Sequence, residues 1–197
     1  MLKKLLSFLS LSVLSLSSYS YMELNFGVGT AEYDTTLLQG NSANGYVSFQ
    51  GYTDSNVTYG VSYNLETTDL YIGSSIYDFD IDTLSASVGY AFGDLSEGAF
   101  RIGGSISSIS YTANGYDVSS LFDTSGYYFN AAYSRMSEEG INYNVGLTVD
   151  LDDCDDNCEI VGGYVGFPIG ASNWNFNLSA GFADGVSYFG IGPTVKF

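Results

Sequence analysis

The feature that most constrains the fold is a two-residue alternation between bulky apolar side chains and small or polar ones. In residues 186–197, Phe189, Ile191, Val195 and Phe197 share one parity, and glycine, threonine and lysine fill most positions between them. Successive side chains of a β-strand point to opposite faces, so this run predicts a strand with one apolar face and one polar face.

The same alternation recurs along the chain after residue 20. It predicts ten strands, or eight if two of the runs are loops. We interpret residues 66–82 as a long loop with strand extensions, although the arms of a protruding hairpin would also fit. The ten expected strands are residues 22–33, 43–53, 56–66, 81–92, 99–111, 125–135, 140–150, 159–168, 173–182 and 186–197.

The polar faces of these strands are unusual because they carry almost no charge. Glycine (24 residues), tyrosine (18) and phenylalanine (13) are abundant, which favours strands and turns over helices. A soluble sandwich would pack its apolar faces together and expose charged side chains to water. A transmembrane barrel would turn the aromatic face to lipid and enclose the small polar face. The near absence of lysine and glutamate on the polar face favours the barrel.

Residues 1–20 have the pattern of a secretory signal peptide. Lys3 and Lys4 precede an apolar run, and Ser18 and Ser20 stand at the −3 and −1 positions of a cleavage site. An N-terminal membrane anchor is the alternative, but the run is short and rich in serine. Removal of this leader would leave three basic and 22 acidic residues in a single domain, 21–197.

The leader, the alternation and the ending Thr194-Val195-Lys196-Phe197 resemble those of small bacterial outer-membrane β-barrels of the porin-like and OmpA-type superfamily. This resemblance covers residues 21–197. It implies an all-β fold, an antiparallel up-and-down transmembrane barrel, exported to the bacterial outer membrane. It also implies a monomer surrounded by outer-membrane lipid and lipopolysaccharide. The assembly machinery of that membrane would recognise an assembly signal made of Phe189, Ile191, Val195 and Phe197.

The connections between the expected strands alternate in length. Outer-membrane barrels place long loops outside the cell and short turns in the periplasm, and an even strand count puts both chain ends on the periplasmic side. The short link 183–185 is an exception, because it falls on the side of the long loops. The long segments are 34–42, 66–81, 112–124 and 150–158, and the mostly short ones are 53–56, 93–98, 135–140 and 169–173.

Composition also limits the function. The acidic balance argues against a nucleic-acid partner, and nothing in the sequence predicts a cofactor. The outer-membrane enzymes that this chain resembles in size rely on a catalytic histidine, and the chain has none. We therefore expect a non-enzymatic barrel with a structural role or a binding role carried by its loops. A narrow porin-like channel for small solutes is the alternative.

Three charged residues are expected on the inner face: Glu23, Arg101 and Lys196. Glu23 begins the first strand and Lys196 ends the last, so closure of the barrel would make them neighbours. We expect either an ion pair across this seam or two solvated charges at the rim. We expect Arg101 to fill the interior rather than to clamp a ligand. Trp174 and the tyrosines at strand ends are expected at the membrane interfaces.

The segment 150–159 combines acidic residues with both cysteines. Cys154 and Cys158 predict a local disulfide in an oxidising compartment; a zinc site would need further Cys or His ligands. A solvated acidic loop is expected, and a Ca²⁺ or Mg²⁺ site is the alternative. The candidate oxygen ligands of that metal site are Asp150, Asp152, Asp153, Asp155, Asp156 and Glu159.

Overall fold

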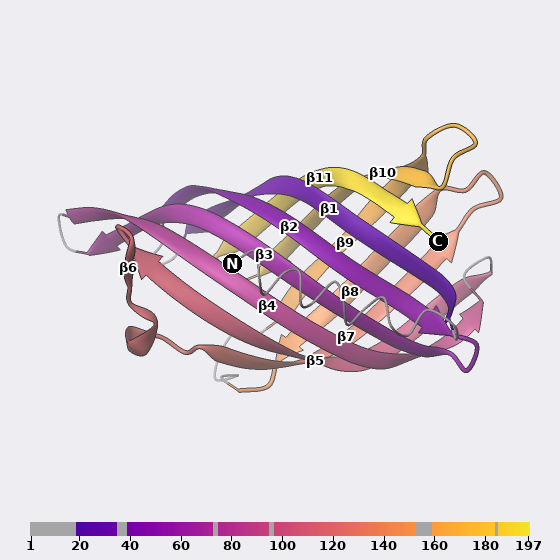
Figure 1. The fold of residues 1–197 in the computed structure, drawn as a ribbon, viewed down its shortest axis with the longest axis horizontal. Helices are drawn as coiled ribbons and strands as arrows, with labels where there is room; N and C mark the ends of the chain where they lie inside the picture. The colour runs from indigo at the N-terminus through magenta and orange to yellow at the C-terminus, as the bar shows by residue number, and fades with distance from the viewer. Residues whose placement is uncertain (1–18, 35–38, 73–74, 95–96, 153–158, 184) are drawn as a thin grey trace.

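The computed structural model describes residues 19–34, 39–72, 75–94, 97–152, 159–183 and 185–197. In these residues the chain forms an antiparallel sheet that closes into a barrel of ten long strands (Figure 1). The elements are β1 (Tyr19–Asp34), β2 (Gln39–Thr53), β3 (Val57–Ile72), β4 (Ser75–Asp94), β5 (Gly98–Ala113), β6 (Tyr116–Asp117), the 3-10 helix η2 (Ser119–Leu121), β7 (Ser125–Met136), β8 (Asn142–Asp150), β9 (Glu159–Pro168), β10 (Trp174–Ala183) and β11 (Val186–Lys196).

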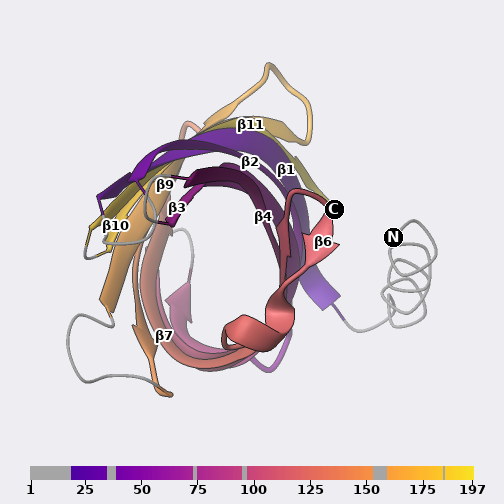
Figure 2. The same ribbon diagram turned by 90° about the vertical axis from the view of Figure 1, so that its left-hand side faces the viewer.

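Each long strand pairs with the next one along the chain, and β11 pairs with β1 to close the ring (Figure 2). The two-residue strand β6 stands outside this ring and pairs only with β5. The turns β2–β3, β4–β5, β7–β8 and β9–β10 lie at the same end as the C-terminus, which we call the turn end; the opposite end is the loop end. The prediction of an up-and-down barrel with ten strands is confirmed.

The polarity of the barrel is the reverse of that of a water-soluble protein. Val88 and Phe182 on the outer face are 63% and 64% exposed, whereas Thr194 and Asn175 on the inner face are 1% and 3% exposed. Such an outer surface is stable only in apolar surroundings. A soluble sandwich is excluded, because the long strands form one closed ring rather than two packed sheets. Within the described residues, no helix combines the length and hydropathy needed to cross a bilayer.

The β3–β4 hairpin extends well past the apolar band. β4 has 20 residues, while a tilted strand of about 9–11 residues spans the bilayer. In the extension the polarity is inverted: Leu70 and Phe79 are buried inside, and Thr67 and Asp69 are exposed outside. The expectation of a loop over 66–82 was therefore wrong in detail, since strands fill most of it. The inverted alternation conceals their continuity with the membrane strands.

Two short connections show how the sequence sets the turns. Asn114 and Gly115 both have positive φ (48° and 82°), so they form the two-residue hairpin turn that joins β5 to β6. β10 ends at Ala183 and β11 begins at Val186, so the short link on the loop side is present as expected.

The seam between β1 and β11 has one interruption. Its ladder pairs Asn25 with Thr194 and Val28 with Ile191, but it pairs neither Phe26 nor Gly27. Pro193 lies at the corresponding position of β11 and has no N–H to donate. The register is the same on both sides of the gap, so the ring stays closed there.

The reversed polarity predicts the effect of a charge on the outer face. Val88→Arg would place a guanidinium in the middle of the apolar band and lower the folding stability in lipid by about 2–4 kcal/mol. Ser110→Arg places the same charge on the outer face of β5 opposite Asp82, beyond the band, and we expect a far smaller loss. Urea titration in liposomes, read by heat-modifiable gel migration, measures both. Equal losses would contradict the placement of the membrane.

Candidate functional site: a turn-end plug and a polar cavity

The turn end of the lumen is filled by a polar cluster that we call the plug. Its centre is the buried carboxylate of Glu23 on β1. Glu23 accepts hydrogen bonds from the Tyr21 hydroxyl and from the Gln50 side-chain amide, the second at 2.6 Å between Nε2 and Oε2. The residues of the plug are Tyr21, Glu23, Gln50, Tyr52, Arg101, Ser134 and Tyr164.

Arg101 enters the plug from β5 on the opposite wall. Its Nη2 donates to the Ser134 Oγ at 3.0 Å, and its guanidinium carbon lies 5.8 Å from the centre of the Tyr52 ring. Its Nε is buried and has no hydrogen-bond partner among the described residues. Tyr164 borders the same small hollow as Tyr21, Glu23 and Tyr52. The plug therefore joins walls of the barrel that are far apart in sequence.

The expected neighbours Glu23 and Lys196 face each other across the seam. Their charges attract, but the hydrogen bonds of Glu23 go to other residues. The Lys196 ammonium lies 4.0 Å from the Met136 sulfur, and it lies 3.0 Å from the Asn175 side-chain oxygen when that amide is oriented to accept from it. A direct ion pair between Glu23 and Lys196 stays a prediction.

A second polar relay crosses the seam one step further into the barrel. The Asn177 amide donates to the Thr194 hydroxyl, which donates to the Asn25 side-chain oxygen. All three residues lie on the inner face of neighbouring strands β10, β11 and β1. The relay supplies side-chain hydrogen bonds close to the ladder gap at Pro193.

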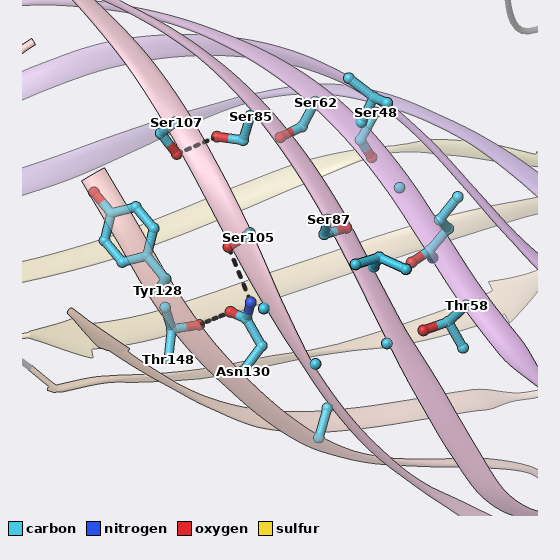
Figure 3. A pocket seen from close by; sticks show the side chains of 18 of the residues that line it. Ser48, Thr58, Ser62, Ser85, Ser87, Ser105, Ser107, Tyr128, Asn130 and Thr148 are labelled. Carbon is cyan, nitrogen blue, oxygen red and sulfur yellow. Dashed lines mark hydrogen bonds between the residues drawn. The ribbon is translucent and has the colours of Figure 1, made fainter. Parts of the chain in front are cut away.

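Beyond the plug, the lumen contains a cavity of about 590 Å³ (Figure 3). Arg101 is the one charged residue in its lining. The polar side chains of the lining are otherwise neutral, and most are hydroxyls: Ser48, Gln50, Thr58, Ser62, Thr83, Ser85, Ser87, Ser105, Ser107, Tyr128, Asn130 and Thr148.

Only some of the polar side chains that line the cavity form hydrogen bonds with one another. Ser85 and Ser107 bond to each other at 2.7 Å. The Asn130 amide donates to Ser105 at 2.9 Å and accepts from Thr148 at 2.9 Å (Figure 3). The other serine and threonine hydroxyls of the wall make no such bond, so they can bind water or a solute.

The loop end contains an apolar cluster and a buried carboxylate. Glu66 accepts hydrogen bonds from the Tyr33 and Ser42 hydroxyls, each at 2.5 Å. The rings of Phe79, Tyr111 and Phe122 pack against one another with centroids 4.8–5.7 Å apart. Outside this cluster, hydrogen bonds from Ser119 lower the pKa of the Asp117 carboxyl.

The acidic segment is only partly described. Asp150, Asp152 and Glu159 lie in the described residues, and the Asp152 N–H donates to an Asp150 carboxylate oxygen at 3.0 Å. No group of three metal-binding side chains occurs in the described part of the chain. The remaining candidates, Asp153, Asp155 and Asp156, and both cysteines, Cys154 and Cys158, fall outside it. The disulfide and the metal site therefore stay predictions.

The proposed assembly residues Phe189, Ile191 and Val195 lie on the outer face of β11, and Phe197 follows directly after that strand. Phe189, Ile191 and Phe197 are exposed and Val195 is half-buried. Trp174, at the start of β10, packs edge-on against Phe26. This placement agrees with contact with lipid, and recognition by the assembly machinery stays a prediction.

Sequence reasoning found the inner charges but not the partners that hold them. The alternation already assigns Gln50 and Glu66 to the inner face, and that signal could have identified both. The alternation does not tell how far along the barrel axis a side chain lies, because that position depends on strand register. Tyr164 is missed because glycines interrupt the alternation around it at Gly162 and Gly163.

Comparisons with known proteins support the fold. No protein-family model matches the chain, and no curated protein matches it significantly. It is similar to the outer membrane protein OprG from Pseudomonas aeruginosa, with a TM-score of 0.50 and 11% identity over 91% of this chain and 97% of that one. It is also similar to the translocator domain of autotransporter NalP from Neisseria meningitidis, with a TM-score of 0.50 and 12% identity over 100% of this chain and 94% of that one. The chain thus has the fold of outer-membrane β-barrels.

The geometry of the plug predicts that Glu23 contributes to stability. Glu23→Ala leaves the Tyr21 hydroxyl and the Gln50 amide without their acceptor, so we expect a loss of about 1–3 kcal/mol in the free energy of unfolding. Glu32→Ala removes an exposed carboxylate from the same strand and should change stability by less than about 0.5 kcal/mol. Urea titrations in liposomes compare the two. An unchanged midpoint for Glu23→Ala would contradict this role of the plug.

Proposed function

We propose that this protein is a non-catalytic barrel of the bacterial outer membrane. In this proposal its lumen is closed at the periplasmic side, and it acts as a structural or binding protein through its extracellular wall. The observation that carries the proposal is the plug. Hydrogen bonds join β1 to β2 and β5 to β7, and the Arg101 guanidinium lies over the Tyr52 ring, so it connects these two pairs of strands across the lumen.

The space left inside the plug supports closure. The hollow between Tyr21, Glu23, Tyr52 and Tyr164 has a volume of only about 20 Å³, which is room for a single water. A hydrated ion that crosses the barrel would therefore have to move the side chains of the plug. Closure of this kind fits the expectation that a barrel of about ten strands fills its interior with side chains.

The extracellular wall supports a binding role. It consists of the parts of β3, β4 and β5 beyond the apolar band together with β6. Its outer face is acidic, with Asp69, Asp78 and Asp80, and Ile76 and Tyr116 are exposed at its edge. Surfaces that combine exposed apolar side chains with a charged rim often mark sites of protein interaction.

The same proposal includes the location and the surroundings of the protein. We propose export with cleavage after Ser20, insertion by the outer-membrane assembly machinery, and function as a monomer in outer-membrane lipid and lipopolysaccharide. The outward apolar face and the similarity to outer-membrane barrels support it.

A narrow channel is the second candidate function. The cavity of about 590 Å³ favours it, because this cavity provides a polar path up to the plug. A channel would require the plug to open, whereas a structural or binding barrel would keep it closed.

Conductance in planar bilayers tests the proposal. We expect the wild-type protein to give no discrete current steps. The double variant Tyr52→Ala/Tyr164→Ala removes two rings from the plug and should produce steps, since it widens the lumen at the turn end. In a salt gradient, the reversal potential should indicate cation preference, because the loops are acidic.

A matched control removes the same number of rings from the outside of the barrel. Tyr90→Ala/Tyr133→Ala removes two exposed rings from the outer faces of β4 and β7 near the same end, and it should stay silent. Discrete steps from the wild-type protein would contradict the proposal and favour the channel. Silence of the double plug variant, with its fold intact, would show that the plug is not the barrier.

A further inference from the structure

A binding role of the extracellular wall would not involve the cavity. Its volume of about 590 Å³ lies within the range of small-molecule binding sites. Its wall consists of residues of β2, β3, β4, β5, β7, β8 and β9, so strands rather than loops position the polar groups (Figure 3). A pocket built on such elements keeps its geometry before a ligand arrives.

Arg101 places a positive charge at one end of this cavity. It is the one charged residue of the lining, and it stands at the end next to the plug. The hydrogen bonds of the nearest carboxylate of the plug, Glu23, go to Tyr21 and Gln50 rather than to Arg101. The Arg101 Nε has no partner among the described residues. That Nε is buried and does not itself reach a solute, but Arg101 lines the cavity, and a guanidinium matches a carboxylate or phosphate oxygen.

The rest of the wall favours a ligand that carries hydroxyl groups. The side chains of Ser48, Thr58, Ser62, Thr83 and Ser87 line the cavity and keep their hydrogen-bonding capacity, because none of them bonds to another side chain of the wall (Figure 3). Each hydroxyl can donate and accept. This pattern suits a solute that carries several hydroxyls of its own, and it offers little to an apolar chain.

We propose that the lumen binds a small anionic polyol, a solute with several hydroxyls and one carboxylate or phosphate. The anionic group contacts Arg101, and the hydroxyls of the solute bond to the serine and threonine wall. With the plug closed, the solute enters from the loop end. This is a separate activity from the one proposed for the extracellular wall.

The acidic balance of the chain does not oppose this site once the solute is inside. The charged residue that lines the cavity is Arg101, and a close charge outweighs distant, screened ones. Asp78 and Asp80 belong to the outer face of the extracellular wall, whereas the cavity is lined by the inner face. The acidic loops therefore slow entry more than they weaken the final complex.

Isothermal titration of the folded, detergent-solubilised protein in about 0.1 M salt tests the proposal. The probes are D-gluconate, sorbitol 6-phosphate, neutral sorbitol, and hexanoate, which has a carboxylate but no hydroxyls. We expect saturable binding of gluconate or of sorbitol 6-phosphate, and whichever binds identifies the anionic group. Sorbitol and hexanoate should bind at least about tenfold more weakly, since each lacks one of the two features.

Charge variants give the matched control. Arg101→Gln should weaken the bound anion at least about tenfold and leave the weak binding of sorbitol unchanged, and Arg101→Lys should restore part of the affinity. Lys196→Gln removes an inner positive charge that does not line the cavity, and it should bind like the wild type. If Arg101→Gln does not fold, Ser87→Leu fills the cavity without altering Arg101 and should abolish binding.

The proposal fails if neither anion binds, if sorbitol binds as tightly as the anions, or if the folded Arg101→Gln and Ser87→Leu variants bind like the wild type. The titration is independent of conductance, so its failure would leave the role of the plug untouched. Conversely, a conducting wild-type protein would not by itself refute this site.

Discussion

Backbone hydrogen bonding in a medium without water is the constraint on which the rest of this structure depends. Hydrocarbon offers no partners to a peptide N–H or C=O, so a sheet inside it must leave no free edge. The pairing of β11 with β1 meets this requirement and brings the two ends of the chain together. The interruption of this ladder at Pro193 falls where the side chains of Asn25, Thr194 and Asn177 form their own relay.

Closure leaves an interior whose contents decide what the barrel can do. The inner face of the membrane strands is lined mainly by glycine, serine, threonine and asparagine, so the interior is polar rather than packed with aliphatic side chains. Large polar residues occupy the turn end, where Glu23 and Arg101 are held by separate sets of partners. Small hydroxyls occupy the middle, where they leave a cavity. The plug and the cavity thus both result from the size of the inward-pointing side chains, which differs along the barrel axis.

Much of the fold follows from the sequence because a period of two fixes both the strands and their faces. The placement of Glu23, Arg101 and Lys196 inside, and the adjacency of the first and last strands, needed only that pattern. The β3–β4 extension could not be predicted in this way. Beyond the bilayer, apolar side chains such as Leu70 and Phe79 point into the barrel, so they occupy the alternate positions that are polar in the membrane-spanning parts of the same strands. The cavity and the partners of Arg101 could not be predicted either, since they depend on register and side-chain direction across strands distant in sequence.

The central claim is that lipid covers the aromatic outer face, and Trp174 reports on it directly as the one tryptophan of the chain. The protein can be refolded into liposomes whose acyl chains carry bromine either near the headgroup or near the bilayer centre. We expect strong fluorescence quenching by the shallow bromines, weaker quenching by the deep ones, and little quenching by aqueous iodide. Efficient quenching by iodide with no effect of brominated lipid would contradict this claim.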